Sequence, residues 1–311
     1  MKTYLLLGVS ALAFMQAPQG TFPPRNQLPF AAIAPATDPM SVCDAEGSSP
    51  TSHPNDAKRR ENAAKNNLRA TGAPTAVEFS DFSKLQSAVG NTPNLTTSRK
   101  VVETPQKVTH GSVGEGSLVQ LVAHLRDAHI ADCLAPNPPT SSGEFGEAVN
   151  CDFIGVKAND FHITLMPLTE PTGDECDSVT AEMIPHFRPD AWQTLDQKTP
   201  TKNPVRVTGT LFFDDSHQPC TPQKKPFSKS DPARRAVWEI HPVYALDVCM
   251  AASDDKCVAT DNTVWMPYDK WVATHSTGTT ITDQDGARAS CNVLAGNKPV
   301  VPPTPKRGRS E

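Results

Sequence analysis

Two segments of this 311-residue chain decide its fold: VRVTGTLFF at Val205–Phe213 and VWEIHPVYALDV at Val237–Val248. Both are rich in the β-branched and aromatic residues that favour strands. Apolar residues recur at every second position, and successive side chains of a strand point to opposite faces. Each segment therefore predicts a strand with one apolar and one polar face, and we expect the polar face to meet solvent. Gly209 predicts a bend or a close backbone approach.

Earlier segments complete the predicted domain. Further strands are expected at Ser117–Arg126, Val149–Ile154 and Phe161–Met166, and mixed or helical structure at Thr180–Leu195. Five strands with a helical piece between the third and fourth match the order of an OB-fold barrel. We therefore predict a mainly β (β-rich α+β) fold, a five-stranded OB-like barrel with one helical insertion between strands 3 and 4, flanked by long irregular segments. A β-sandwich or an open α+β sheet remains an alternative.

Composition divides the rest of the chain. The 30 prolines and a mean hydropathy of -0.42 indicate that part of it does not pack into a core. We expect a Pro/Ser/Asn-rich linker or wrapping region with short helices at 18–110, the OB-like domain at 111–250, and a C-terminal extension packing on it at 251–292. The aromatic segment Val264–Val272 would make that contact, and a disordered tail would follow at 293–311.

The N-terminus has the pattern of a secretory signal peptide. Lys2 precedes a short apolar run, Leu5–Ala13, that ends in Ala-x-Ala. We expect a signal peptide at 1–17, with cleavage near Ala13, Ala17 or Ala34 left open, and a buried N-terminal helix as the alternative. Later segments lack the 18 or so uncharged apolar residues that a membrane span needs. The expected location is therefore periplasmic or secreted.

Cysteine usage supports export independently. The eight cysteines are scattered, without the C-x-x-C pairs of zinc ribbons or thioredoxin-like sites. Disulfides are the better interpretation, and they form in oxidising compartments. Two pairs bracket short loops and are predicted on that ground, Cys133 with Cys151 and Cys249 with Cys257. The remaining connectivity stays open.

Several blocks of sequence carry a family resemblance. They are Glu147–Cys151, Asp160–Ile163, Thr180–Glu182, Val205–Gly209, Phe213–His217 and Trp238–Pro242. In this order they resemble a family of exported bacterial proteins with an OB-like β domain and a Trp-Glu-Ile-His-Pro strand motif. The resemblance covers about residues 116–248, and it implies no activity because none is established for that family. The Lys-rich insertion Thr221–Arg235 departs from the family pattern.

Polar residues inside these blocks are the candidate site. His162, Glu239 and His241 lie on the polar faces of their strands. If the neighbouring acids and histidine converge there, the candidate metal ligands are His162, Asp214, His217, Glu239 and His241, and the candidate catalytic acids and bases are Glu182, Glu239 and His241. A divalent metal would then activate water to hydrolyse a phosphodiester or a glycan. The alternative is that these are ordinary outward-facing polar residues.

A binding function competes with hydrolysis. OB barrels hold nucleic acids or oligosaccharides on a sheet face, using exposed aromatic residues above a basic groove. Phe212 and the basic residues of Lys224–Arg235 are candidates for this role, although the net charge of -5 gives no global attraction to nucleic acid. The G-x-S-x-G, Walker, dinucleotide-binding and H-E-x-x-H motifs are missing. We therefore expect an exported binding or interaction module of unknown ligand, with a metal-dependent hydrolase as the alternative and no organic cofactor.

Overall fold

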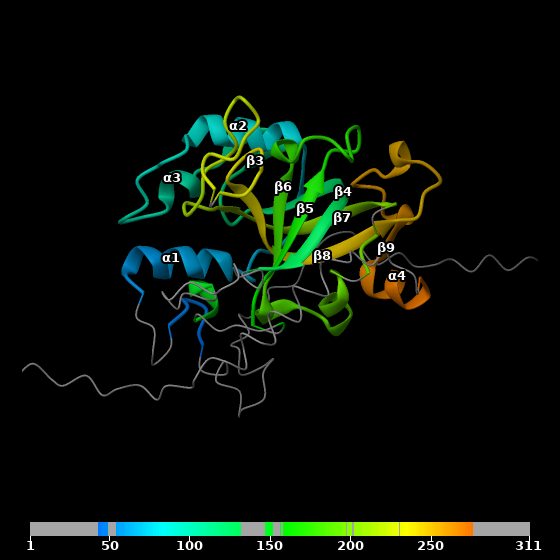
Figure 1. Cartoon of the computed structure of the whole chain (residues 1–311), viewed down its shortest axis with the longest axis horizontal. Helices are drawn as coiled ribbons and strands as arrows, with labels where there is room; N and C mark the ends of the chain where they lie inside the picture. The colour runs from blue at the N-terminus through cyan, green and yellow to red at the C-terminus, as the bar shows by residue number, and fades with distance from the viewer. Residues whose placement is uncertain are drawn as a thin grey trace, which may run out of the picture.

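A closed five-stranded β-barrel lies at the centre of the protein (Figure 1). The structure is a computed structural model that describes residues 43–48, 54–131, 147–151, 156, 158–196, 198–200, 202–229 and 231–275. The barrel strands are β4 (Leu118–Ile130), β5 (Phe161–Met166), β6 (Val179–Met183), β7 (Pro204–Phe213) and β8 (Trp238–Cys249). Neighbouring strands follow the order β4-β5-β6-β8-β7, and β7 pairs with β4 to close the barrel.

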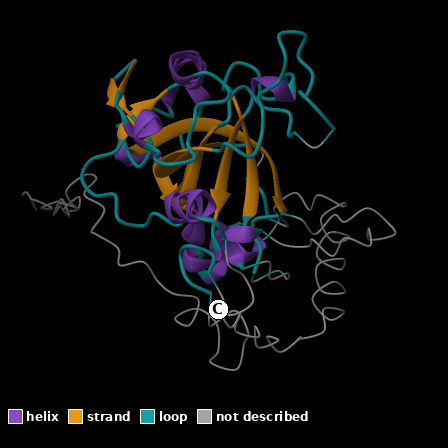
Figure 2. Cartoon of the chain, turned by 90° about the vertical axis from the view of Figure 1, so that its left-hand side faces the viewer, coloured by secondary structure: helices purple, strands orange, loops and turns teal. Residues whose placement is uncertain are grey.

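Shorter elements surround this barrel (Figure 2). They are α1 (Asp56–Lys65), β1 (Thr75–Val77), α2 (Phe79–Val89), α3 (Lys100–Glu103), β2 (Gln106–Val108), β3 (Gly111–Val113), β9 (Trp265–Pro267) and α4 (Tyr268–Thr274). β1 lies parallel to β4, β9 lies antiparallel to β8, and β2 and β3 form a separate hairpin. The segment before the barrel is thus joined to it by backbone pairing.

The strand order confirms the predicted OB-like fold. The third and fifth strands, β6 and β8, pair in parallel, while the other barrel pairs are antiparallel. Two 3-10 helices, Pro185–Phe187 and Asp190–Thr194, connect β6 to β7. The predicted helical insertion between strands 3 and 4 therefore exists as these two short helices.

The prediction of the second and third strands, at Val149–Ile154 and Phe161–Met166, is wrong in position. Ala148–Asn150 is a 3-10 helix rather than part of a strand, and residues 152–154 lie outside the described part of the chain. The buried Asn150 amide donates to Asp160 Oδ1 at 3.0 Å, and Cys151 is held in a turn at a φ of 56°. β5 is therefore the second strand, and the third is β6, which ends shortly before Pro185 begins a 3-10 helix.

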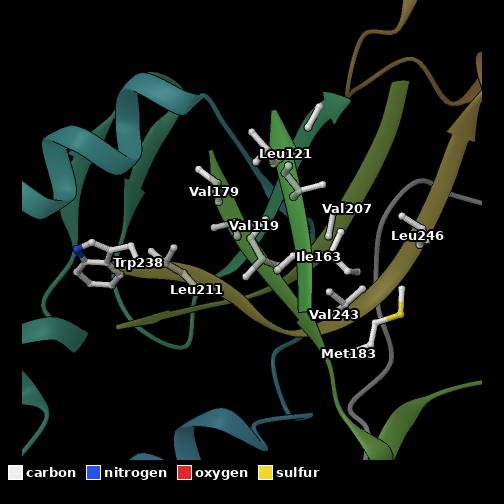
Figure 3. Close-up of a cluster of buried hydrophobic side chains, with 14 of the residues drawn as sticks. Val119, Leu121, Ile163, Val179, Met183, Val207, Leu211, Trp238, Val243 and Leu246 are labelled. Carbon is white, nitrogen blue, oxygen red and sulfur yellow. The ribbon is translucent and has the colours of Figure 1, made fainter. Parts of the chain in front are cut away.

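Alternate side chains of the barrel strands form one buried apolar core (Figure 3). Val119 comes from β4, Ile163 from β5, and Leu211 from β7, and each is at most 1% exposed. Gly209 makes the predicted close approach, since a Cβ there would lie 2.3 Å from the carbonyl oxygen of Pro242. The register of β7 against β8 shifts at this point.

The shift also changes which residues of β8 share a face. Strict alternation along Val237–Val248 predicts that Tyr244 faces the core with Ile240. It packs instead in a second cluster with Leu68 and Ile184, and its hydroxyl donates to the carbonyl of Asn67 at 2.6 Å. The break in regular pairing explains this difference, because a strand keeps its period of two only while its pairing is regular.

The expectation that the polar strand faces meet solvent is wrong. All residues of β7 are buried, including those on its outer face. Arg206 binds Asp247 at 2.7 Å and lies 4.9 Å from the ring centroid of Trp265 in β9, while Phe212 lies beneath Lys65 of α1. The outer face of β7 is therefore covered by segments that come before and after the barrel in the sequence. The periodicity of β7 alone cannot predict this cover.

The predicted helices before the barrel are present as α1 and α2. Phe82 and Leu85 of α2 enter the main core. Asp81 caps this helix by accepting from the amide of Glu78 at 2.9 Å, and it also binds Lys84 and Thr109. Burial raises the pKa of Asp81, but these hydrogen bonds outweigh it and lower that pKa below its usual value.

Three disulfides cross-link the described residues. They join Cys43 to Cys151, Cys176 to Cys220, and Cys249 to Cys257. The predicted 249–257 pair is confirmed, whereas the pair of Cys133 with Cys151 is wrong because Cys151 binds Cys43. Cys133, Cys291, the predicted signal peptide and the predicted tail lie outside the described residues. Such bonds are typical of an oxidising compartment. Within the described ranges, none of the helices has the length and apolar character to cross a membrane.

Candidate functional site

A pocket of about 760 Å³ opens on the outer face of β5 and β6. One wall comes from residues 147–149 before β5, another from the β7–β8 connection, and a third from α1. Its lining includes Lys58, Asn62, Lys65, Glu147, His162, Thr164, Thr180, Glu182, Asp214, Ser216, His217, Ala233, Arg234 and Glu239. OB-like barrels bind ligands on the face of their second and third strands, between the connection of strands 1 and 2 and the connection of strands 4 and 5. Here these are the β4–β5 connection, which contains residues 147–149, and the β7–β8 connection.

Strand register brings the candidate polar residues onto this face. His162 of β5 stands opposite Glu182 of β6, and Ala181 stands opposite Ile240 of β8. Ile240 and Ala181 point into the core. Their neighbours Glu182, Glu239 and His241 therefore point outward, because successive side chains alternate.

His162 lies in the pocket wall between two carboxylates. Its Nε2 is 3.3 Å from Glu182 Oε1 and 3.8 Å from Glu147 Oε1. Burial alone would lower the pKa of His162, but the two carboxylates outweigh it and raise this pKa to about 10. Burial would raise the pKa of Glu182, yet the charges of His162 and His241 hold it well below its usual range.

His241 is fully buried beneath the pocket. Its Nδ1 is 2.8 Å from Glu182 Oε2 and 3.6 Å from Glu239 Oε2, and its Nε2 is 3.6 Å from Asp160 Oδ2. Burial opposes protonation, but Glu182 and Glu239 raise the pKa of His241 to about 10. Burial, followed by the charge of Glu147, raises the pKa of Asp160 to about 7. This cluster thus gathers ionisable groups that strongly affect one another.

Arg234 pairs with two acids on the other side of the pocket. Its Nη2 lies 2.7 Å from Asp214 Oδ2, and its Nη1 donates to Glu239 Oε1. All three side chains are at most 3% exposed. Despite burial, Arg234 and His217 hold the pKa of Asp214 well below its usual value. His217 Nδ1 lies 2.6 Å from Asp214 Oδ2, and that hydrogen bond raises the pKa of His217.

Lys65 brings a positive charge to the pocket from the last turn of α1. Its ammonium lies 5.6 Å from the ring centroid of Phe212. Burial would lower the pKa of Lys65, but the surrounding carboxylates, led by Glu182 and Asp214, raise it well above its usual value. Lys65 therefore stays charged and can meet an anion or a hydroxyl oxygen.

The structure brings together most of the sequence-predicted candidates. His162, Glu182, Glu239 and His241 form one connected cluster, and Asp214 and His217 adjoin it through Arg234. Among the described residues, two groups have potential metal-ligand atoms within 4.8 Å of one another, namely Glu147–His162–Glu182 and Asp160–Glu182–His241. Asp214, His217 and Glu239 belong to neither group.

Sequence reasoning missed Lys65, Glu147, Asp160 and Arg234. Glu147 and Asp160 begin two of the blocks that carry the family resemblance, so that signal could have identified them. Lys65 gives no such signal, since it is one of several basic residues in α1. Arg234 belongs to the basic segment that the sequence offers as a candidate for binding nucleic acid or oligosaccharide, so its pairing with buried acids could not be foreseen.

The features expected of a nucleic-acid groove are placed differently. Phe212 is fully buried and cannot stack on a base. Arg234 is enclosed by carboxylates, while Lys224 and Arg235 both contact Asp177. These cations of the insertion are thus already paired within the protein.

No protein-family model, curated protein or solved structure matches this chain. The resemblance to a family of exported proteins therefore stays a prediction.

Proposed function

We propose that the protein is an exported binding module that takes a hydroxyl-bearing ligand, such as the end of an oligosaccharide, in the pocket over β5 and β6. The observation that carries this proposal is the position of the pocket, on the ligand-binding face of an OB-like barrel and between its two binding connections. Its volume of about 760 Å³ falls in the range of small-molecule sites.

The lining favours a ligand that both donates and accepts hydrogen bonds. Glu147 and Glu182 offer acceptors, Lys65 offers a donor, and the hydroxyls of Thr164 and Thr180 can do both. Sugar hydroxyls have the same dual character. Among the described lining residues there is no Phe, Tyr or Trp on which a nucleic-acid base would stack.

Export is the second part of this proposal, and it is supported by the three disulfides and the predicted signal peptide. The full chain would be expressed in a bacterial host, and the mass of the exported product would be measured. We expect a mature N-terminus near Ala13, Ala17 or Ala34. Recovery of only the uncleaved chain from the cytoplasm would reject export.

Filling the pocket tests the ligand proposal. Thr180 is half-buried, lies opposite Thr164 in the strand register, and lines the pocket without joining the ionic cluster. Trp is well suited to strands, so Thr180→Trp should fill the space and keep the fold. The control is Val101→Trp, at a residue of α3 that is 47% exposed.

Binding is measured as a shift in thermal unfolding against a panel of oligosaccharides. A ligand at about 100 times its Kd raises the free energy of unfolding by about 2.7 kcal/mol. We expect the wild type and the Val101→Trp variant to show this shift and the Thr180→Trp variant to lose it. If no oligosaccharide shifts the wild type, the proposed ligand is wrong, and if Thr180→Trp keeps the full shift, the proposed binding site is wrong.

A second candidate is a metal-dependent hydrolase of a glycan or phosphodiester. It is favoured by the contact of His162 with Glu182 in the pocket wall, an imidazole and a carboxylate 3.3 Å apart. Release of nitrophenol from nitrophenyl glycosides and from bis-nitrophenyl phosphate, in the presence of Zn²⁺ or Mn²⁺, is the test. Activity that Glu182→Gln abolishes would support this function, and lack of turnover of both substrate classes would reject it.

A further inference from the structure

We propose that Glu147, His162 and Glu182 bind one divalent transition-metal ion at the wall of the pocket. This ligand set shares only His162 with the one that the sequence suggests, because Asp214, His217, Glu239 and His241 are not part of it. The site does not depend on the oligosaccharide ligand proposed above, although the hydrolase alternative would require it.

Distances between the three side chains suit a small ion. In a tetrahedral zinc site with bonds of about 2.0–2.2 Å, neighbouring ligand atoms lie about 3.3–3.6 Å apart. His162 Nε2 lies 3.3 Å from Glu182 Oε1 and 3.8 Å from Glu147 Oε1, and the three ligand atoms fall within 4.8 Å of one another. All three residues line the pocket, so a fourth position would face the ligand space.

The second observation is that a buried ligand atom of this group lacks a hydrogen bond. His162 Nε2 is buried and forms no hydrogen bond within the described part of the chain, although the carboxylates of Glu182 and Glu147 lie 3.3 and 3.8 Å away. Glu182 is only 5% exposed and turns Oε1 toward His162, while its Oε2 lies 2.8 Å from His241 Nδ1. An ion bound to His162 Nε2 and Glu182 Oε1 would satisfy the imidazole and leave Oε2 to His241.

Contacts on the side away from the proposed ion hold both carboxylates in place. Glu147 Oε2 accepts from Asn150 Nδ2 at 3.1 Å and from the backbone amide of Asp160 at 2.9 Å, which leaves Oε1 facing His162. His241 lies behind Glu182. Supporting contacts of this kind hold the ligands of metal sites in place.

Charge favours a cation at this position. Glu147 and Glu182 place two carboxylates against His162 in the pocket wall. Arg234 lies on the other side of the pocket, where Asp214 and Glu239 bind it. A divalent ion would therefore meet opposite charge between Glu147 and Glu182.

The donor set selects the class of ion. One imidazole and two carboxylates suit Zn²⁺ and Mn²⁺, whereas Ca²⁺ takes six to eight oxygen ligands. Zn²⁺ is therefore the first probe, and Ca²⁺ is the comparison ion.

The test uses the full chain after EDTA treatment and dialysis. Calorimetric titration should give one Zn²⁺ per chain with a Kd of about 1 μM or tighter, and Ca²⁺ should bind far more weakly. Co²⁺ should give the intense visible absorption of a tetrahedral site. His162→Gln and Glu182→Gln should each weaken Zn²⁺ binding by about 100-fold or more. The control His110→Gln replaces an exposed histidine that contacts Glu78 elsewhere on the surface, and it should bind as the wild type does.

Circular dichroism would establish that each variant is folded, and His162→Gln, at the more exposed position, keeps the test valid if Glu182→Gln does not fold. Absence of saturable Zn²⁺ binding, or equal binding by folded His162→Gln, would overturn the proposal and leave the protonated histidines as the description of the cluster.

Oligosaccharide binding is measured separately on EDTA-treated protein. Saccharide binding without Zn²⁺ binding would reject the metal site alone, and the reverse result would reject the saccharide alone.

Discussion

Arg234 offers the sharpest test of how the pocket is held together. Its guanidinium is 1% exposed and is shared between Asp214 and Glu239, whose side chains are 3% and 1% exposed. Arg234→Met keeps the length of the side chain and removes its charge. Two buried carboxylates would then lose the guanidinium that they share, and each would keep only an imidazole, His217 beside Asp214 and His241 beside Glu239.

The size of the effect follows from this burial. Removing one partner of a buried ion pair costs about 3–5 kcal/mol, because the remaining charge is left uncompensated. The neighbouring Arg235 provides a matched control, since it is 24% exposed and lies 3.5 Å from Asp177. A partly exposed pair of this kind contributes about 0–1 kcal/mol. The two substitutions therefore differ by one position in sequence and by several kcal/mol in expected cost.

Urea denaturation measures both free energies of unfolding. We expect Arg234→Met to lose about 3–5 kcal/mol and Arg235→Met less than about 1 kcal/mol. Adding Asp214→Asn and Glu239→Gln to Arg234→Met should recover most of the loss, because no buried charge is then left unpaired. Similar costs for the two arginine variants, or failure of the triple variant to recover stability, would refute the reasoning.

Three other measurements test the fold. Folding lowers the pKa of Asp81, so its contribution to stability is present above pH 3.8 and is lost as the pH falls below that value. Asp81→Asn should lower the free energy of unfolding by about 1.5–3 kcal/mol at pH 7. In urea titrations at a series of pH values, the variant should lose less of this free energy at acid pH than the wild type does. Replacing both Cys43 and Cys151 by Ala opens a link across 108 positions and should lower the free energy of unfolding by about 5 kcal/mol, and a loss under 1 kcal/mol would contradict this estimate. Gly209→Ala should lower the free energy of unfolding by about 1–3 kcal/mol and with it the thermal midpoint, since the added Cβ would lie 2.3 Å from Pro242 O. An unchanged midpoint would show that the backbone relaxes freely.

The barrel could be predicted because most of its strands have a clear period of two. Val205–Phe213 and Val237–Val248 nearly coincide with β7 and β8. β6 escaped detection because it has only five residues and lies close to Pro185, so its alternation is short and the following turn dominates the pattern. Val149 and Cys151 resembled a strand, but their conformation is set by a disulfide and by the contacts of Asn150.

Only part of the site could be predicted. The placement of Glu239 and His241 on one outer face follows from alternation alone. Their burial does not, because it depends on α1 and on the β7–β8 connection, which approach from distant parts of the chain. The salt bridges of Arg234 likewise require the β7–β8 connection to fold back over β8, and no local sequence pattern predicts that course of the chain.

The spread of pocket residues along the sequence, from Lys58 to Glu239, has a consequence for how the protein is made. Contacts between such distant positions form slowly, since long stretches of chain must be brought together first. A growing chain cannot assemble the pocket until β8 has been synthesised, although Cys43 and Cys151 are already available for oxidation. A fragment that stops before β8 would therefore be cross-linked but without a binding site, and it would expose the unpaired edges of β6 and β7 to aggregation.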